Sequence, residues 1–350
     1  KALGTAPFKP GLARAQRFVN LSWLTRLEEG YSRAVPLQMI PAFPEKAVAA
    51  AEKKRKDWEA GIEGLNWVRK QLDEVGRQEQ MLLTLVDGGF ERVVEFWRQL
   101  PDRVILLGRT ARSRVLYELP GAYSGLGRPP SYGERARTPA EWLKEKLGWT
   151  TLQVKVRGKQ REMVYRVEGP YVREGLPDRP VFLIVVRGMD RKVNGRRVKR
   201  DPAFYLVSAG QQAQQWVLPL PIETLLAWAW QRWELEVSHR EMKSGFGLGE
   251  KQCWNVRSAV TSVQWSAWVY ALLLLSGYRA WGLCKGPAAP ARWSKSAHRW
   301  SFNTLWRAYR ADLWGSQDFL AVCSLSMDNW SKKEAWLVAL RNASAAAARS

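Results

Sequence analysis

The sequence contains few of the residues from which disulfide scaffolds and zinc sites are built. Its 350 residues include only three cysteines and two histidines. An odd and sparse set of cysteines excludes a disulfide scaffold and is typical of a reducing cytosol, so we expect a cytoplasmic protein. Because there is no CxxC motif and His239 and His298 are the whole supply of histidine, a zinc ribbon or zinc finger is also excluded.

Three common catalytic or nucleotide-binding motifs are missing as well. The chain has no GxxxxGK[ST] loop, no GxGxxG after a predicted strand and no GxSxG elbow. The glycines of Gly245-Phe246-Gly247-Leu248-Gly249 end a helical pattern instead of opening one. These absences argue against a P-loop enzyme, a dinucleotide-binding enzyme and a serine hydrolase. The sequence shows no signal-peptide pattern. Because its first residue is Lys1 and not Met, we expect a fragment or a chain that lacks upstream codons.

Acidic residues are also scarce relative to basic ones. There are 55 Lys and Arg against 33 Asp and Glu, a net charge of +22 and an isoelectric point near 10.2. This balance predicts a polyanionic partner, nucleic acid first and an anionic membrane surface second. The composition is 46% hydrophobic, which is typical of a globular protein, and 20 tryptophans can build a large core or stack on bases.

One segment tests whether the chain could cross a membrane. Ser258–Tyr278 carries no charge and is long enough to span a bilayer. Serine, threonine and glutamine side chains interrupt its apolar residues. We therefore interpret it as a buried helix, with a membrane span as the alternative.

The first third of the chain has the pattern of a mixed α/β domain. Arg17–Leu27 and Tyr31–Ile40 are β-rich runs on either side of a Glu-Glu-Gly turn and predict a hairpin. Glu45–Gln80 predicts one or two helices. The strand Met81–Val86, a helix over Phe90–Leu100 and a strand over residues 103–107 then form a βαβ unit, so these two strands should be parallel. The fold class is therefore α/β, with a mixed sheet flanked by helices.

The middle of the chain is β-rich and strongly basic. After a Gly- and Pro-rich stretch, four segments predict strands: Leu152–Val156, Met163–Val167, Val181–Arg187 and Phe204–Val207. The loop Arg187–Arg200, with its Asn194-Gly195 turn, holds seven cations and one aspartate. It predicts phosphate contacts, chiefly through Arg191, Lys192, Arg196 and Arg197, although a solvated hairpin tip has the same composition.

A long helix over Glu223–Lys243 carries the most informative pattern. At 100° per residue, four polar residues share one stripe, whereas the expected core face is Trp230, Trp233 and Val237; the stripe consists of Arg232, Glu236, His239 and Lys243. The plain alternative is a solvent-exposed stripe with an Arg232/Glu236 pair. Two histidines are too few for a di-iron site built on Glu-x-x-His. A second helix is expected over Val256–Ala280.

Asp87 is the other candidate for chemistry. It follows a predicted strand, just before Gly88-Gly89, and ligands gather at the carboxyl ends of strands in open α/β sheets. An N-cap of the next helix is the equal alternative. Carboxylates at Asp87 and Glu236 are hard oxygen donors that suit Mg²⁺, with Mn²⁺ as a substitute, and two such ions can activate water for phosphodiester cleavage.

With these residues in view, the sequence resembles the DDE-type transposases of bacterial insertion sequences. Their last catalytic helix carries Tyr-x2-Arg-x3-Glu-x6-Lys, and Arg232, Glu236 and Lys243 match three of its four places, with Ala229 at the tyrosine place. Leu85-Val86-Asp87-Gly88-Gly89-Phe90 is similar to the segment around their middle acid. Gly127-Arg128-Pro129-Pro130-Ser131-Tyr132-Gly133 resembles a Gly-Arg-Pro segment of the branch that has a β-rich insertion.

The resemblance implies an RNase H-like core and assigns roles to the matching residues. Asp87 and Glu236 would be catalytic metal ligands, and Arg232 and Lys243 would hold DNA near the scissile phosphate. The family also has an earlier acid. Gly4 stands at its place if Gly4-Thr5-Ala6-Pro7 aligns with an Asp-x-Thr-Pro segment, and otherwise the acid is expected upstream of Lys1.

This resemblance gives the expected organisation and function. Residues 1–110 would form the first part of the core, 111–215 a β-rich insertion, 216–283 the catalytic and following helices, and 284–350 a helical basic tail. The expected activity is Mg²⁺-dependent cleavage and strand transfer of transposon-end DNA by a homodimer on double-stranded DNA, at the nucleoid and not at a membrane. The alternative is an inactive or domesticated copy that binds DNA without cutting it. We expect residues 1–350 themselves not to cut.

Overall fold

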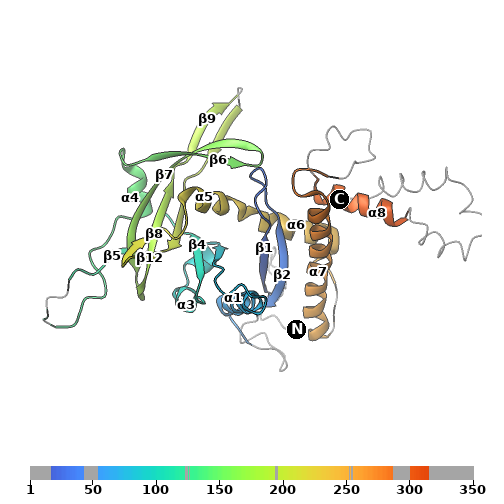
Figure 1. Cartoon of the computed structure of the whole chain (residues 1–350), viewed down its shortest axis with the longest axis horizontal. Helices are drawn as coiled ribbons and strands as arrows, with labels where there is room; N and C mark the ends of the chain where they lie inside the picture. The colour runs from blue at the N-terminus through green and yellow to red at the C-terminus, as the bar shows by residue number, and fades with distance from the viewer. Residues whose placement is uncertain are drawn as a thin grey trace, which may run out of the picture. The chain divides into compact units, whose positions relative to one another are not determined.

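The computed structural model describes residues 17–42, 54–122, 125, 127–193, 196–251, 253, 255–286 and 300–314. They form mixed α/β structure in two compact units, and Figure 1 labels the elements. The first unit comprises Lys1–Leu21 and Ile40–Arg232, and the second comprises Ser22–Met39 and Trp233–Ser350. The predicted α/β class is confirmed, with a curled mixed sheet flanked by helices.

The predicted N-terminal hairpin is confirmed. β1 (Phe18–Leu24) and β2 (Ala34–Pro41) form a two-stranded sheet, and each strand runs from one unit into the other. Glu28 and Tyr31 exchange backbone hydrogen bonds of 3.0 and 2.8 Å across the turn. Gly30 has a φ of 72°, a left-handed conformation that glycine adopts at little cost.

α1 (Asp57–Glu74) is the described part of the helix predicted over Glu45–Gln80; residues 45–53 of that prediction lie outside the described residues. Hydrogen bonds join the C-terminal part of α1 to the loop that precedes the next strand. The Arg69 guanidinium donates to the carbonyl of Arg77 at 2.7 Å and to that of Gln80 at 2.5 Å. These bonds satisfy carbonyls that a loop would otherwise leave to water.

The predicted βαβ unit is confirmed in its strands. β3 (Leu82–Val86) and β4 (Val104–Arg109) are parallel neighbours. The single helix predicted between them is wrong, because α2 (Gly88–Glu91) and α3 (Val94–Arg98) are separate. The carbonyl of Glu91 accepts hydrogen bonds from the Trp97 indole at 2.7 Å and from a guanidinium at 3.0 Å, and so takes no part in a continuous helix.

The strands of the β-rich region join β3 and β4 in one seven-stranded sheet. The order is β3-β4-β11-β8-β7-β5, and β6 pairs with β7. The bounds are β5 (Tyr117–Glu118), β6 (Thr150–Val156), β7 (Lys159–Arg173), β8 (Leu176–Val186) and β11 (Ala203–Ser208). The four predicted strands are therefore present, and all four belong to the same sheet as the strands of the βαβ unit.

Apolar cores cover both faces of this sheet. On one face Leu106 and Leu183 pack with Phe96 and Trp97 of α3. On the other, Leu107 and Ile184 pack with Leu225 of α5 (Ile222–Gln231). Strands buried on both faces read as nearly continuous apolar runs, which is the pattern of Val181–Val186. α4 (Pro139–Lys144) precedes β6.

Two small hairpins accompany the sheet. β9 (Met189–Val193) and β10 (Arg196–Arg200) pair antiparallel, as predicted for the basic loop; residues 194–195 at its turn lie outside the described residues. β12 (Gly210–Gln212) pairs with β13 (Gln215–Val217). In Figure 1 the first of these, labelled at β9, extends beyond the end of β8.

The single helix predicted over Glu223–Lys243 is two helices. α5 ends at Gln231 and α6 (Trp233–Phe246) begins after Arg232, which also divides the two units. The predicted core face is wrong for α6. Trp233 is 50% exposed, and the buried side carries Glu234, Ser238 and Met242. Because the helix is interrupted at Arg232, the rotation of 100° per residue cannot be carried from α5 into α6 to predict which side is buried.

The second unit packs α6, α7 (Val256–Trp281) and α8 (Phe302–Trp314) around aromatic side chains. Phe246, Tyr270 and Phe302 lie with ring centroids 4.9 to 5.7 Å apart. The predicted helix over Val256–Ala280 is confirmed. Of the predicted tail, residues 287–299 and 315–350 lie outside the described residues.

α7 is only partly the buried helix that we expected. One side is buried, as at Tyr270 and Leu274, whereas Trp265, Trp268 and Leu272 are 49 to 65% exposed. Within the described residues it is one helix that is long and apolar enough to cross a bilayer, and 33% of its most apolar window is buried. A core helix of a soluble protein passes the same test, so this property alone does not place α7 in a membrane.

Candidate functional site

Asp87 stands at the carboxyl end of β3 and begins α2. One oxygen of its carboxylate accepts hydrogen bonds from the backbone N–H groups of Gly89 at 2.9 Å and Phe90 at 3.3 Å. The N-cap interpretation is therefore confirmed. The side chain is exposed, and its second oxygen has no hydrogen bond or ion pair with the described residues. The cap thus holds the carboxylate in place and leaves one oxygen for a ligand.

Asp87 follows β3 directly, next to two polar residues that are paired on the neighbouring strands. Val86 is in register with Gly108 in the parallel pair, which puts Asp87 level with Arg109. Arg109 is in turn the direct antiparallel partner of Tyr205 on β11. Directly opposed residues have Cβ atoms about 5 Å apart on the same face. Arg109 and Tyr205 therefore share one face of the sheet, and Asp87 follows the strand next to that of Arg109.

Three arginines act electrostatically on the phenol of Tyr205. Burial raises the pKa of Tyr205, and the charges of Arg109, Arg232 and Arg200 oppose that rise. Arg109 is exposed and makes no ion pair or side-chain hydrogen bond with the described residues. Periodicity had singled out Arg232 but neither Arg109 nor Tyr205, because their proximity to Asp87 depends on strand register.

A buried ionic cluster supports the turn after Asp87. The carboxylate of Glu91 is 1% exposed and lies 2.6 Å from the Arg114 guanidinium and 3.7 Å from that of Arg173. Arg173 also lies 5.0 Å from the centroid of the Trp97 ring. Burial lowers the pKa of Arg173 to about 10, and the charge of Glu91 opposes this. Two guanidinium groups compensate one buried carboxylate and hold α2 against the sheet.

In the second unit, α6 lines an open depression of about 530 Å³. Its walls combine acids, cations and a histidine: Glu236, His239, Arg240, Lys243, Ser244 and Glu250. The depression therefore gathers Glu236, His239 and Lys243, three of the four residues of the predicted stripe. Burial lowers the pKa of His239, and the positive charge of Lys243 lowers it further.

The opposite side of α6 is anchored by a second buried network. The Glu241 carboxylate lies 3.2 Å from the Arg33 guanidinium and accepts a hydrogen bond of 2.7 Å from the Tyr270 hydroxyl. Burial, followed by the charge of Glu241, raises the pKa of Tyr270. Arg33 lies 5.2 Å from the Trp300 ring centroid. These contacts set the rotation of α6, so that Glu236 and Lys243 point into the depression.

The two aspartates that precede Asp87 in the chain, which are candidates for the family's first acid, are both in ion pairs. Asp57 pairs with Arg17 at 3.2 Å, and Asp73 pairs with Arg69 at 3.0 Å and with Arg103 at 3.6 Å, so both serve the ends of α1. Gly4 lies outside the described residues. Within the described ranges, no three His, Cys, Asp or Glu side chains are grouped closely enough to hold a metal ion. Metal binding by Asp87 and Glu236 therefore stays a prediction.

The predicted DNA-binding residues of the basic loop lie on the β9–β10 hairpin. The register pairs Lys192 with Arg197, Arg191 with Val198 and Val193 with Arg196. The first pair therefore occupies one face of the hairpin, and the next pairs occupy the other. Six of its ten strand residues are Lys or Arg, against one Asp.

A ladder of arginine and tryptophan side chains stands at the base of this hairpin. The guanidinium carbons of Arg137 and Arg166 lie over the Trp142 ring, 5.1 and 4.2 Å from its centroid. Those of Arg166 and Arg187 lie over the Trp149 ring, at 5.5 and 4.0 Å. Each of the two rings therefore contacts two guanidinium groups, and Arg166 is common to both.

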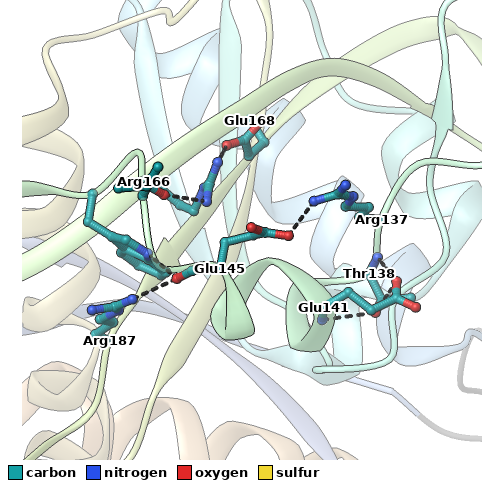
Figure 2. A network of polar contacts seen from close by, with 9 residues as sticks. Arg137, Thr138, Glu141, Glu145, Arg166, Glu168 and Arg187 are labelled. Carbon is teal, nitrogen blue, oxygen red and sulfur yellow. Dashed lines mark hydrogen bonds and ion pairs between the residues drawn. The ribbon is translucent and has the colours of Figure 1, made fainter.

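Polar contacts fix the ladder from its edges, as Figure 2 shows. Arg166 pairs with Glu168, and Arg137 pairs with Glu145. The Glu145 carbonyl accepts hydrogen bonds of 2.7 Å from both Arg187 and the Trp149 indole. The loop after α4 is therefore joined to the end of β8, immediately before β9.

No protein-family model matches this chain, and a search of curated proteins finds no match.

Proposed function

We propose that this chain derives from a DNA transposase with an RNase H-like core, which cleaves transposon ends and transfers strands by a metal-dependent reaction. One observation carries the proposal. An exposed carboxylate, Asp87, ends a strand of a parallel pair, and the chain later supplies Arg232, Glu236 and Lys243 at the spacing of a catalytic helix. The net charge of +22 supports a polyanionic substrate.

The paired residues Arg109 and Tyr205, on β4 and β11, support phosphate binding in the region of Asp87. Arg109 is exposed and carries a planar set of donors that match a phosphate. Tyr205, the strand partner of Arg109, can donate a hydrogen bond from its neutral hydroxyl. The positive charge of Arg232 also acts on this phenol. These groups would hold a DNA strand by its backbone and keep its scissile phosphate at Asp87.

The donor set suits Mg²⁺. Asp87 presents a free carboxylate oxygen, and Glu236 presents a carboxylate at the wall of an open depression; such hard oxygen donors are those that Mg²⁺ prefers. When bound there, Mg²⁺ or Mn²⁺ would supply a more acidic water and offset charge on the leaving 3′ oxygen. Lys243 and His239 would hold the strand through its phosphates.

A second candidate is a copy that binds DNA without cutting it. It is favoured because the described residues contain no group of three acidic or histidine ligands, and because Asp57 and Asp73 are engaged in ion pairs. A single remaining carboxylate pair would leave at least one metal ion weakly held. A barrier raised by about 5 kcal/mol corresponds to a rate roughly 10³- to 10⁴-fold lower.

DNA binding tests what the two candidates share. Affinity for duplex DNA should fall steeply with salt, because each neutralised phosphate contributes about 0.9 to the slope of log K against log salt. Replacing the four cations Arg191, Lys192, Arg196 and Arg197 by alanine should flatten that slope by up to about four units. A chain that does not bind duplex DNA at moderate salt contradicts both candidates.

Nicking separates the candidates. We expect purified residues 1–350 with Mn²⁺ to leave a duplex that carries the element's end intact. Nicking by the Gly4→Asp variant would support the transposase, provided that Asp87→Asn or Glu236→Gln in the same background abolishes it while DNA binding persists. Inactivity of both the parent and Gly4→Asp would exclude Gly4 as the place of the first acid and would leave duplex binding as the activity of residues 1–350. Nicking that survives Asp87→Asn and Glu236→Gln would remove both residues from the site.

A further inference from the structure

The β9–β10 hairpin is a two-stranded ribbon separate from the seven-stranded sheet. Within the described part of the chain its two strands pair only with each other, whereas β8 and β11 on either side belong to the seven-stranded sheet. The register runs from Met189↔Arg200 at the base to Val193↔Arg196 near the turn. Five residues of strand extend about 16 Å, which is long enough to reach deep into a nucleic-acid groove.

Basic residues hold register positions on both faces of the ribbon. Since paired residues share a face and successive pairs alternate, one face holds the positions of Lys192, Arg197 and Lys199. The other face holds those of Arg191, Arg196 and Arg200. A ribbon that lay flat on one phosphate backbone would use only half of these charges. A ribbon between two phosphate walls would use all of them.

The base of the ribbon is fixed on both strands by an arginine on a tryptophan. Before β9, Arg187 lies 4.0 Å from the ring centroid of Trp149. At the end of β10, Arg200 lies 5.6 Å from the ring centroid of Trp230 on α5. A Cβ atom at Gly188 would come within 2.7 Å of the Arg200 carbonyl oxygen, so the two strands also meet closely here. We call the Arg187–Trp149 and Arg200–Trp230 contacts the clamps of the ribbon. They restrict the direction in which the ribbon extends from the sheet.

We propose that the β9–β10 ribbon enters the major groove of duplex DNA, where its two cationic faces meet the phosphates of both walls. The proposal rests on the DNA function proposed above and names the mode of contact. The major groove is about 12 Å wide and admits a two-stranded ribbon, whereas the minor groove is about 6 Å wide. Two strands about 4.8 Å apart, with basic residues at register positions on both faces, match the width of the major groove.

Methylation protection tests the groove. Dimethyl sulfate attacks guanine N7 in the major groove, and we expect residues 1–350 to protect these atoms in a bound duplex. Netropsin, which occupies the minor groove, should not displace the protein. A bound duplex with unprotected N7 atoms, or displacement by netropsin, overturns the proposal and leaves the DNA function standing. Absence of any duplex binding contradicts the DNA function itself.

A cross-strand pair identifies the ribbon as the element responsible. The Lys192→Ala/Arg197→Ala variant should lose N7 protection, and its salt slope should fall by about two units. The matched control is Arg77→Ala/Arg112→Ala, which removes two exposed arginines of the same unit. Its protection pattern should remain. Equal effects of the two double variants would mean that only net charge matters, which would overturn the groove assignment.

The clamps are tested without touching a ribbon cation. Trp149→Leu removes the surface under Arg187 and keeps every positive charge. We expect trypsin to cleave within Arg191–Arg200 faster in the free variant and guanine protection to weaken several-fold, with folding checked by circular dichroism. The control is Trp265→Leu, at an exposed tryptophan of the second unit. Unchanged cleavage and protection in folded Trp149→Leu would show that the clamp does not position the ribbon.

Discussion

The carboxylate of Glu91 and the guanidinium of Arg114 lie 2.6 Å apart, and Glu91 is 1% exposed. With Arg173, which is 3% exposed, they form a charged cluster inside the sheet unit. This cluster lies one helical turn after Asp87, whose carbonyl accepts the Glu91 N–H at 3.0 Å. A buried charge without its partner is far more costly than the paired cluster, and this asymmetry leads to the first prediction.

Glu91→Gln should lower the free energy of unfolding by about 3–5 kcal/mol, because it leaves Arg173 buried without an opposing charge. Urea unfolding followed by tryptophan fluorescence measures this loss. Glu95→Gln is the control, since Glu95 forms an exposed pair with Arg98 that is worth about 0–1 kcal/mol. Equal losses in the two variants would show that the cluster contributes no more than a surface pair.

Gly108→Ala should destabilise the sheet unit by about 1–3 kcal/mol. A Cβ atom at this position would lie 2.8 Å from the Cβ of Glu91 and 3.1 Å from a methyl carbon of Val86, neither of which can move freely. Gly121→Ala is the matched control, because a Cβ there meets nothing within 4 Å. Thermal unfolding should separate the two variants, and equal melting temperatures would contradict the close packing at Gly108.

Tyr171 should make the protein sensitive to alkali. Burial, followed by the charges of Glu168 and Glu118, raises its pKa to about 12, whereas an unfolded tyrosine titrates near 10. The stabilising contribution is therefore complete below about pH 10 and is lost as pH rises toward 12, by about 1.4 kcal/mol per pH unit. Tyr171→Phe should lose less stability than the parent between pH 9.5 and 11 on this account. Parallel stability curves would contradict it.

His239 should titrate below the usual histidine range, because burial and then Lys243 lower its pKa. The chain has only two histidines, so proton NMR should resolve their ring signals, and His239→Gln assigns them. Lys243→Met removes the neighbouring positive charge and should move the midpoint upward. If the titration midpoint of His239 is the same in Lys243→Met as in the parent, the side chains of His239 and Lys243 do not interact across the depression.

Local patterns in the sequence were sufficient for much of the fold. The hairpin turn at Gly30, the parallel strands on either side of Asp87 and the four strands of the β-rich region all follow from short-range alternation and turn residues. The helix breaks were not predictable in this way. Glu91 ends α2 because distant Trp97 and Arg173 side chains take its carbonyl, and a periodicity count contains neither partner.

The amino-acid sequence by itself determined the composition-level properties of this protein: a large excess of positive charge, an α/β element order and the spacing of Arg232, Glu236 and Lys243. Only the tertiary structure decided that Tyr205 is paired with Arg109, that Trp233 is exposed, and that Arg166 lies over both Trp142 and Trp149. The physical reason is that net charge depends only on composition, and periodicity depends only on residues that are close together in the sequence. Register and packing instead depend on pairs of residues far apart in sequence, which become neighbours only when the sheet assembles.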